Sequence, residues 1–171
     1  MAFNPDDGYL YALERWNDPN GSNVLRIGQG GVTTVVPGLR TPPNPSFAYS
    51  GYWAGMEYHD NKLWLYSSDA SRITSLDLRD GKTTVHNFAG VAFAAANDLV
   101  YHDGYFWSVR NDGYVLRYDV RDNTVVGLPA PQLAISDPYG YGAGWVTGSG
   151  LLGFVANGTG RVFHIRVTDS N

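Results

Sequence analysis

Residues 99–128, LVYHDGYFWSVRNDGYVLRYDVRDNTVVGL, decide the fold of this chain. Runs rich in Tyr, Trp, Val and Leu alternate with turn residues, which predicts β-strands at Leu99–His102, Tyr105–Arg110, Tyr114–Val120 and Thr124–Leu128. Asp103-Gly104 and Asp122-Asn123 lie between strands, where such pairs close tight hairpins because they tolerate a positive φ. The stretch therefore predicts a four-stranded antiparallel meander.

Three other stretches follow the same pattern: AFNPDDGYLYAL (2–13), AGMEYHDNKLWLY (54–66) and GAGWVTGSGLLGFV (142–155). In the third strand of each unit Ile27, Leu76, Tyr118 and Ile165 fall in register, at spacings of 49, 42 and 47 residues. A period in the forties with several short strands per repeat is typical of propeller blades. The units are expected at roughly 1–45, 46–90, 91–136 and 137–171.

The expected fold class is all-β: a β-propeller or propeller-like array of about four four-stranded units in a single domain, 1–171. The last unit stops at VTDSN, directly after its third strand, so it lacks its outer strand, and the first unit begins at its first strand. Unpaired strand edges invite pairing. We therefore expect the chain to be part of a larger propeller or to associate with itself or with neighbouring domains.

Composition narrows the classes of function. The chain has 12 basic and 16 acidic side chains, a net charge of −4 and no block of like charge, which argues against nucleic acid as a partner. No apolar run approaches the length of a membrane-spanning helix, so no membrane insertion is expected. The absence of cysteine excludes disulfides and thiolate metal sites. A nucleophile elbow, a phosphate loop and a zinc-binding helix are also missing, so we expect neither an enzyme nor a cofactor.

Two groups of polar residues resemble sites. His59-Asp60 and His102-Asp103 look like acid/base pairs, but they occupy the same turn of successive units, which favours a repeated structural role. The loop Asn17–Asn23 carries oxygen donors at 18, 20 and 22, the alternate spacing of a calcium loop. Its glycine is misplaced and no bidentate acid follows, so an ordinary polar loop is favoured and no metal site is expected.

The aromatic residues form two sets. Tyr11, Trp64 and Trp107 hold the same place in the second strand of consecutive units and are expected to pack between blades. The second set lies in the loops and connectors that open on one face of a propeller, where exposed rings beside Asp, Asn and Arg suit a sugar or a peptide. The candidate ligand-binding residues are Trp16, Asp18, Tyr52, Trp53, Arg110, Asp112, Tyr139 and Tyr141. The alternative, that several of these rings fill the central channel, stays open.

Three strings carry a family resemblance: AFNPDDGYLYAL, NVLRIG (23–28) and especially GYGAGWVTGSGLLGFVANGTGRVFHI (140–165). They resemble an uncharacterised propeller-like domain of secreted and cell-surface proteins in actinobacteria and fungi. The resemblance implies an extracellular, non-catalytic module and supplies no catalytic residues.

The leading functional hypothesis is a non-catalytic surface module, secreted or at the cell surface, that binds or displays and that recognises a glycan or a surface protein. A second hypothesis is a structural component of a surface assembly, fibre or virion. A third is a propeller-type lyase or hydrolase that works from the same loop-bearing face.

Overall fold

The computed structural model describes residues 1–15, 18–43, 53–67, 72–88, 98–128 and 137–167, and they are almost entirely β-strand and turn. Among these residues the only helix is a short 3₁₀ turn, η1 (Gln29–Gly31), and no helix is long and apolar enough to span a membrane. The chain forms two compact units, residues 1–87 and 88–171, which are described separately. Their boundary lies three residues from the expected junction of the second and third repeats.

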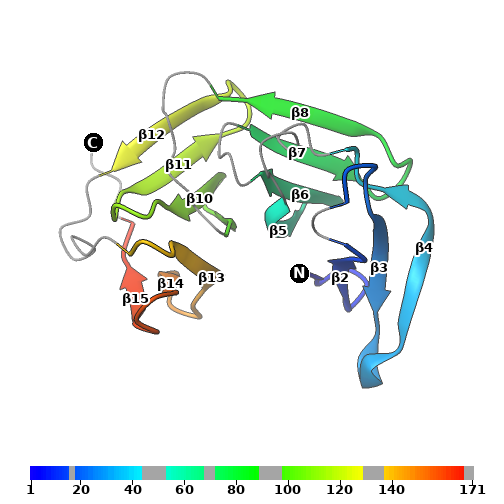
Figure 1. Ribbon diagram of the computed structural model, residues 1–171, viewed down its shortest axis with the longest axis horizontal. Coiled ribbons are helices and arrows are strands. Elements are labelled where there is room, and N and C mark those ends of the chain that lie inside the picture. The colour runs from blue at the N-terminus through cyan, green and yellow to red at the C-terminus, as the bar shows by residue number, and fades with distance from the viewer. Residues whose placement is uncertain (16–17, 44–52, 68–71, 89–97, 129–136, 168–171) are drawn as a thin grey trace. The chain divides into compact units, whose positions relative to one another are not determined.

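Unit 1 contains two antiparallel sheets of four strands each, and in both the strands follow one another in chain order (Figure 1). The first sheet consists of β1 (Ala2–Asn4), β2 (Tyr9–Leu13), β3 (Asn23–Ile27) and β4 (Thr33–Arg40). The second consists of β5 (Trp53–His59), β6 (Lys62–Ser67), β7 (Arg72–Asp77) and β8 (Thr83–Asn87). Each sheet is thus one blade of the expected kind.

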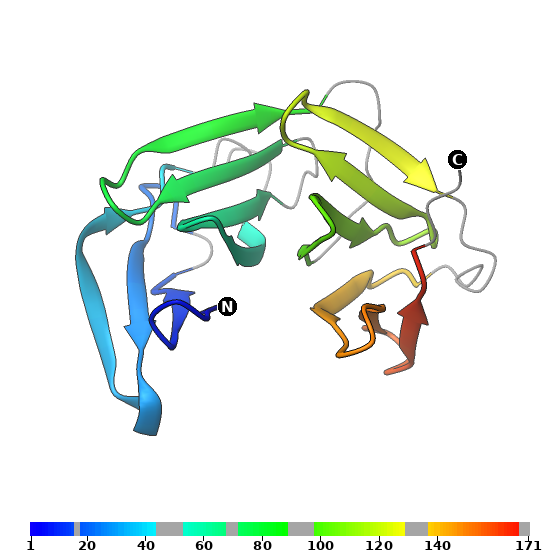
Figure 2. The same ribbon diagram turned by 180° about the vertical axis from the view of Figure 1, so that it is seen from behind.

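Unit 2 contains one sheet of four strands and one of three, again as simple meanders (Figure 2). The four-stranded sheet consists of β9 (Val100–His102), β10 (Tyr105–Val109), β11 (Val115–Asp119) and β12 (Thr124–Leu128), each within one residue of the predicted bounds. The three-stranded sheet consists of β13 (Tyr141–Val146), β14 (Leu152–Ala156) and β15 (Val162–Ile165). The last blade ends at its third strand, as the sequence predicted.

Within each unit the first strands of the two blades are neighbours: β1 contacts β5 in unit 1, and β9 contacts β13 in unit 2. Meanders whose first strands converge are the building plan of a propeller. The prediction of an all-β protein of the β-propeller class with four blades, the last without its outer strand, is confirmed.

The tight turns form where the sequence places residues that accept a positive φ. Asp60 and Asn61 have φ values of 51° and 55°, and Asp103 and Gly104 have 55° and 85°. Two consecutive residues at positive φ give the hairpin turn whose twist matches that of the strands. The repeated His-Asp pairs therefore serve these turns, which confirms their structural interpretation.

The same two turns anchor the buried tryptophans. Trp64 is 6% exposed and its indole nitrogen donates to the carbonyl of His59 at 3.0 Å. Trp107 is 1% exposed and its indole nitrogen donates to the carbonyl of His102 at 2.9 Å. A buried indole needs an acceptor, and the turn supplies it in both blades. Tyr11 is also buried, and it donates its hydroxyl proton to Asp7 at 2.7 Å.

Each unit has a core shared by its two blades. In unit 1 Val24 of the first blade packs in one cluster with Leu63 and Leu76 of the second. In unit 2 Trp107 packs in one cluster with Leu152 and Phe154. Both faces of β7 are buried, since residues 73–76 are all buried.

Candidate functional site

Three loops of unit 2 are joined by hydrogen bonds into what we call the loop cluster: residues 110–114, 137–140 and 157–161. The N–H of Asp137 donates to the carbonyl of Asn111 at 2.8 Å. Asn157 donates its backbone N–H to the carbonyl of Gly140 at 3.0 Å and its side-chain amide to that of Tyr139 at 3.1 Å. These hydrogen bonds hold the three loops side by side.

Asp137 is the residue that fastens the loop cluster. It is 1% exposed, and its two carboxylate oxygens accept the N–H groups of Tyr139 and Gly158, each at 2.9 Å. Carboxylates that accept backbone N–H groups make strong, well-oriented hydrogen bonds. One side chain therefore fixes two loops. Asp137 is followed by Pro138 and Tyr139, and an Asp-Pro pair is a turn signal in the sequence.

Tyr139 is the most exposed aromatic side chain of the loop cluster, at 72%. Its ring lies against Gly158, where an added Cβ would be 2.9 Å from the ring carbon Cδ2. The glycine therefore lets the ring rest close to the backbone of the neighbouring loop. The result is a solvent-facing ring on a backbone that two other loops hold in place.

Arg110 and Asp112 form a two-pronged ion pair beside this ring's loop. The Nε of Arg110 donates to Oδ1 of Asp112 at 2.7 Å, and its Nη2 contacts Oδ2. The guanidinium also lies over the ring of Tyr114, 4.9 Å from the centroid, and this ring is 43% exposed. Hydrogen bonding to Arg110 lowers the pKa of Asp112, so its carboxylate stays ionised. Tyr114, which the sequence assigned only to a strand, adds a second exposed ring.

Two predicted ligand-binding rings lie in the core. Tyr141 is fully buried and meets Phe163 edge-on at 6.0 Å. Trp53 is 6% exposed and packs in the core of unit 1. Both belong to the first strand of a blade, and both rings are buried there. The sequence pattern assigned Trp53 and Tyr141 to connectors, whereas they are the first residues of β5 and β13.

The other predicted residues do not join the loop cluster. Trp16 and Tyr52 lie outside the described residues. Asp18 belongs to unit 1, where its carboxylate accepts the N–H of Asn20 at 2.9 Å and lies 3.9 Å from Arg15. The calcium-like spacing of this loop thus produces hydrogen bonds within the loop. No group of three or more His, Cys, Asp or Glu side chains in the described part of the chain could hold a metal ion.

Unit 2 holds a second carboxylate that joins two blades, the partly buried Asp98. Its oxygens accept the N–H of Gly144 at 2.5 Å and that of Leu99 at 2.9 Å, and burial raises its pKa. Gly144 lies in a bulge of β13, next to Ala143 at a φ of 50°. The side chain of Asp98 therefore links the third blade to the fourth. No motif in the sequence predicts this role.

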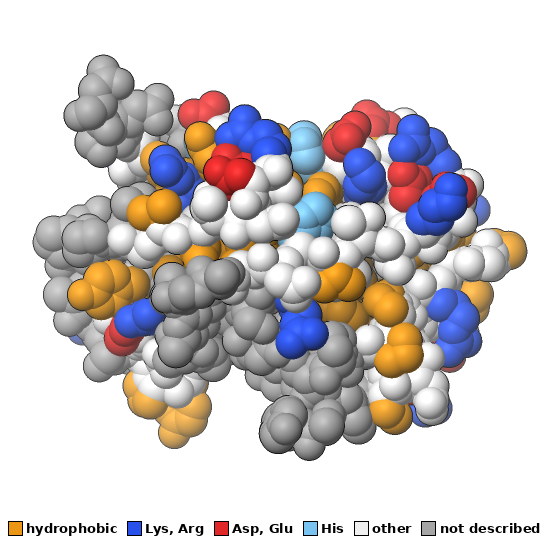
Figure 3. Space-filling model, turned by 90° about the horizontal axis from the view of Figure 1, so that it is seen from above, with side chains coloured by type: hydrophobic (Ala, Val, Ile, Leu, Met, Phe, Trp, Pro, Cys, Tyr) orange, Lys and Arg blue, Asp and Glu red, His pale blue; other side chains and the backbone are white. Residues whose placement is uncertain are grey.

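The surface charges do not form a single-sign patch on the face shown in Figure 3, where acidic and basic side chains lie next to one another. Among the described residues several ion pairs join residues two apart, such as Asp80 with Lys82 and Asp119 with Arg121. Such pairs leave little net field to attract a polyanion.

Comparison with family models places this sequence. Residues 1–171 match the model described as "Repeat of unknown function (DUF6923)". The chain belongs to this family. The resemblance seen in the sequence is thus confirmed as far as a repeat family of unknown function with a propeller-like fold. A search of curated proteins found no match.

Solved structures share the fold at low identity. A glutaminyl cyclase of Myxococcus xanthus is similar over 96% of this chain and 70% of its own, with a TM-score of 0.66 and 18% identity. A protein of unknown function from Bacteroides thetaiotaomicron has a TM-score of 0.67 and 14% identity, over 91% of this chain and 41% of its own. A streptogramin B lyase has a TM-score of 0.56 and 17% identity, over 98% of this chain and 57% of its own. The chain thus spans about half the length of the last two, and the likeness concerns the fold alone.

Proposed function

We propose that this protein is a non-catalytic binding module that recognises a glycan at the loop cluster of unit 2. The observation that carries the proposal is Tyr139, whose exposed ring stands on a backbone fixed by the buried Asp137. Ordered sites with an aromatic platform and a few placed polar groups are the usual form of small-ligand sites.

The chemistry of the loop cluster suits a sugar. The apolar face of a pyranose can stack on the ring of Tyr139, and its hydroxyls can donate to Asp112, whose side chain is 38% exposed. Because Arg110 holds that carboxylate in place, little side-chain freedom is lost on binding. One sugar unit bound by a ring and two or three hydrogen bonds has a Kd in the micromolar to millimolar range, about −4 to −8 kcal/mol.

The carboxylates of the loop cluster support a binding role over a catalytic one. A general acid needs a pKa near the working pH, whereas Arg110 moves the pKa of Asp112 in the opposite direction. Asp137 uses both of its oxygens to hold backbone N–H groups. The lyase or hydrolase hypothesis has its support in the fold, which a cyclase and a lyase share.

A glycan array read with the full chain tests the proposal. We expect the wild-type protein to bind a subset of neutral glycans. Tyr139→Ala should bind them at least about tenfold more weakly, which corresponds to a loss of roughly 1.4 kcal/mol in binding free energy. The matched control is Phe3→Ala, which removes a ring that is 57% exposed in unit 1 and should bind as the wild type does. Equal binding by both variants would overturn the proposal.

The competing roles have their own readouts. Release of reducing ends from the bound glycan would favour the enzyme, and capture of a surface protein with no glycan bound would favour a protein partner. Following the resemblance in the sequence, we place the binding outside the cell or at its surface, which fractionation of the source cells would test.

A further inference from the structure

The first blade differs from the next two at one pair of equivalent positions. In the second blade Asp77 lies opposite the first residue of the second strand, and it pairs with Arg79 through both guanidinium prongs. In the third blade Asp119 occupies the same place and pairs with Arg121 in the same way. Counting from the paired third strands, the first blade has Gly28 and Gly30 instead.

In the third blade side chains fill this space. Two guanidinium groups, of Arg117 and Arg121, lie over the ring of Tyr105 at 4.6 Å and 5.3 Å from its centroid. The carboxylate of Asp119 lies among them, bonded to Arg121 at 2.8 Å through Nε. Ring, cations and carboxylate thus form one closed cluster.

The first blade keeps the ring and one cation but not the rest. Arg26 lies over the ring of Tyr9, 4.4 Å from the centroid, at the positions of Arg117 and Tyr105. The Nε of Arg26 is buried without a hydrogen-bond partner, and among the described residues no carboxylate forms an ion pair with it. Arg26 is therefore a cation without an ion-pair partner among the described residues.

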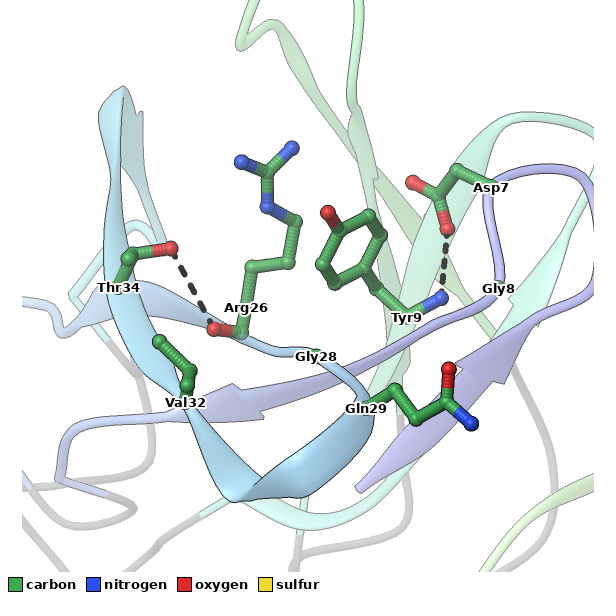
Figure 4. A pocket seen from close by; sticks show the side chains of 8 residues that line it. All are labelled: Asp7, Gly8, Tyr9, Arg26, Gly28, Gln29, Val32 and Thr34. Atoms are coloured by element: carbon green, nitrogen blue, oxygen red, sulfur yellow. Dashed lines mark hydrogen bonds between the residues drawn. The ribbon is translucent and has the colours of Figure 1, made fainter.

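A pocket of about 500 Å³ opens where the Asp–Arg pair is absent (Figure 4). Arg26 and Tyr9 stand side by side in it, with Thr34 on one side and Gln29 on the other. Gly28 lies at the floor of the pocket, and an added Cβ there would be 3.0 Å from the Tyr9 ring. The loss of two side chains has thus turned a filled cluster into a cavity of ligand size.

Asp7 gives the pocket a second, opposite end. It lies across Tyr9 from Arg26 in Figure 4, and its oxygens accept the N–H of Tyr9 at 3.0 Å and the hydroxyl of Tyr11 at 2.7 Å. A carboxylate retains acceptor capacity beyond two bonds. A ligand that places an anion at Arg26 and hydroxyl donors toward Asp7 matches both ends.

We propose that this pocket binds a uronic acid, that is, a sugar carrying a carboxylate. The ligand's carboxylate takes the place that Asp119 holds in the third blade and pairs with the terminal nitrogens of Arg26, its ring lies beside Tyr9, and its hydroxyls reach Asp7, Gln29 and Thr34. Guanidinium–carboxylate pairing is strong and directional. The site is separate from the loop cluster and does not depend on it.

The test is an NMR titration of the ¹⁵N-labelled full chain with glucuronate, glucose and acetate at equal ionic strength. We expect glucuronate to shift the amides of Gly8, Gly28 and Gln29 and to bind at least about tenfold more tightly than glucose or acetate. Acetate binding as tight as that of glucuronate would overturn the assignment to a sugar, and glucose binding equal to glucuronate would overturn the role of the anion.

Three variants locate the site. Arg26→Gln removes the cation, and Gly28→Asp restores the carboxylate of the other blades, so both should weaken glucuronate binding at least about tenfold. Arg117→Gln, the matched control in unit 2, should bind as the wild type does. Binding that survives Arg26→Gln or Gly28→Asp, in proteins with wild-type circular dichroism, would overturn the proposal. Tyr139→Ala should leave these shifts intact, which separates this site from the loop cluster.

Discussion

Replacing Trp107 by Phe tests whether the indole–turn hydrogen bond is a structural element of the repeat. The indole is 1% exposed, and its N–H donates to the carbonyl of His102 at 2.9 Å. Phenylalanine keeps most of the apolar volume but loses the donor, so the carbonyl of a partly buried turn loses its partner.

The expected loss in the free energy of unfolding is about 1–3 kcal/mol for Trp107→Phe, the range for leaving a buried acceptor unpaired. Trp107→Ala should cost about 3–5 kcal/mol, because a cavity is added to the lost bond. Trp64→Phe should follow the same order with a smaller loss, since Trp64 is 6% exposed.

Urea denaturation followed by circular dichroism measures the loss, and hydrogen exchange shows where it arises. The amides of β10 should lose protection first in Trp107→Phe, because local opening follows local stability. A change within about 0.5 kcal/mol, the range of an ordinary surface substitution, would refute the role of the hydrogen bond.

Three further predictions follow from the structure. Asp98 has a raised pKa in the folded state, so acidification from neutral pH toward 4 should stabilise the wild type relative to Asp98→Asn. Parallel urea titrations of the two proteins at several pH values measure this effect. A difference in unfolding free energy that stays constant with pH would contradict it. Burial and Asp7 raise the pKa of Tyr11 to about 12, so the stability that it contributes is present below pH 10 and is lost between pH 10 and 12; Tyr11→Phe should show a flatter alkaline profile, and parallel profiles would count against this. β15 is the edge strand of its sheet and Val162 is 56% exposed, so we expect self-association through this edge, with Val162→Lys shifting the sedimentation coefficient toward that of a monomer; a wild type that remains monomeric at high concentration would refute it.

Most of the fold could be predicted because the repeat states it four times. Turn pairs such as Asp103-Gly104 have few alternative conformations, and they place the strand ends to within one residue. The buried state of Trp64 and Trp107 followed from their equivalent positions. Burial on both faces of β7 could not be read from the sequence, because the residues that it buries include the polar Thr74 and Ser75.

The candidate sites were predicted less well, for a physical reason. Whether an aromatic residue near a strand end faces solvent depends on where the strand begins. Tyr141 is the first residue of β13 and lies in the core, whereas Tyr139 belongs to the preceding turn, in which Gly140 has a φ of 73°, and is exposed. The pocket of the first blade lies where the Asp and Arg side chains of the next two blades are absent. Gly28 and Gly30 become informative only when the equivalent Asp–Arg pairs are known to fill that space.

The most direct test of the binding function is an NMR titration of the ¹⁵N-labelled full chain with the neutral glycan that the array selects. Saturable shifts are expected at the amides of Gly140, Asn157 and Gly158, which adjoin Tyr139 in the loop cluster, and Tyr139→Ala should need at least about tenfold more glycan for the same shifts. Saturable binding that leaves the loop cluster unshifted, or cleavage of the glycan during the titration, would contradict a non-catalytic site there.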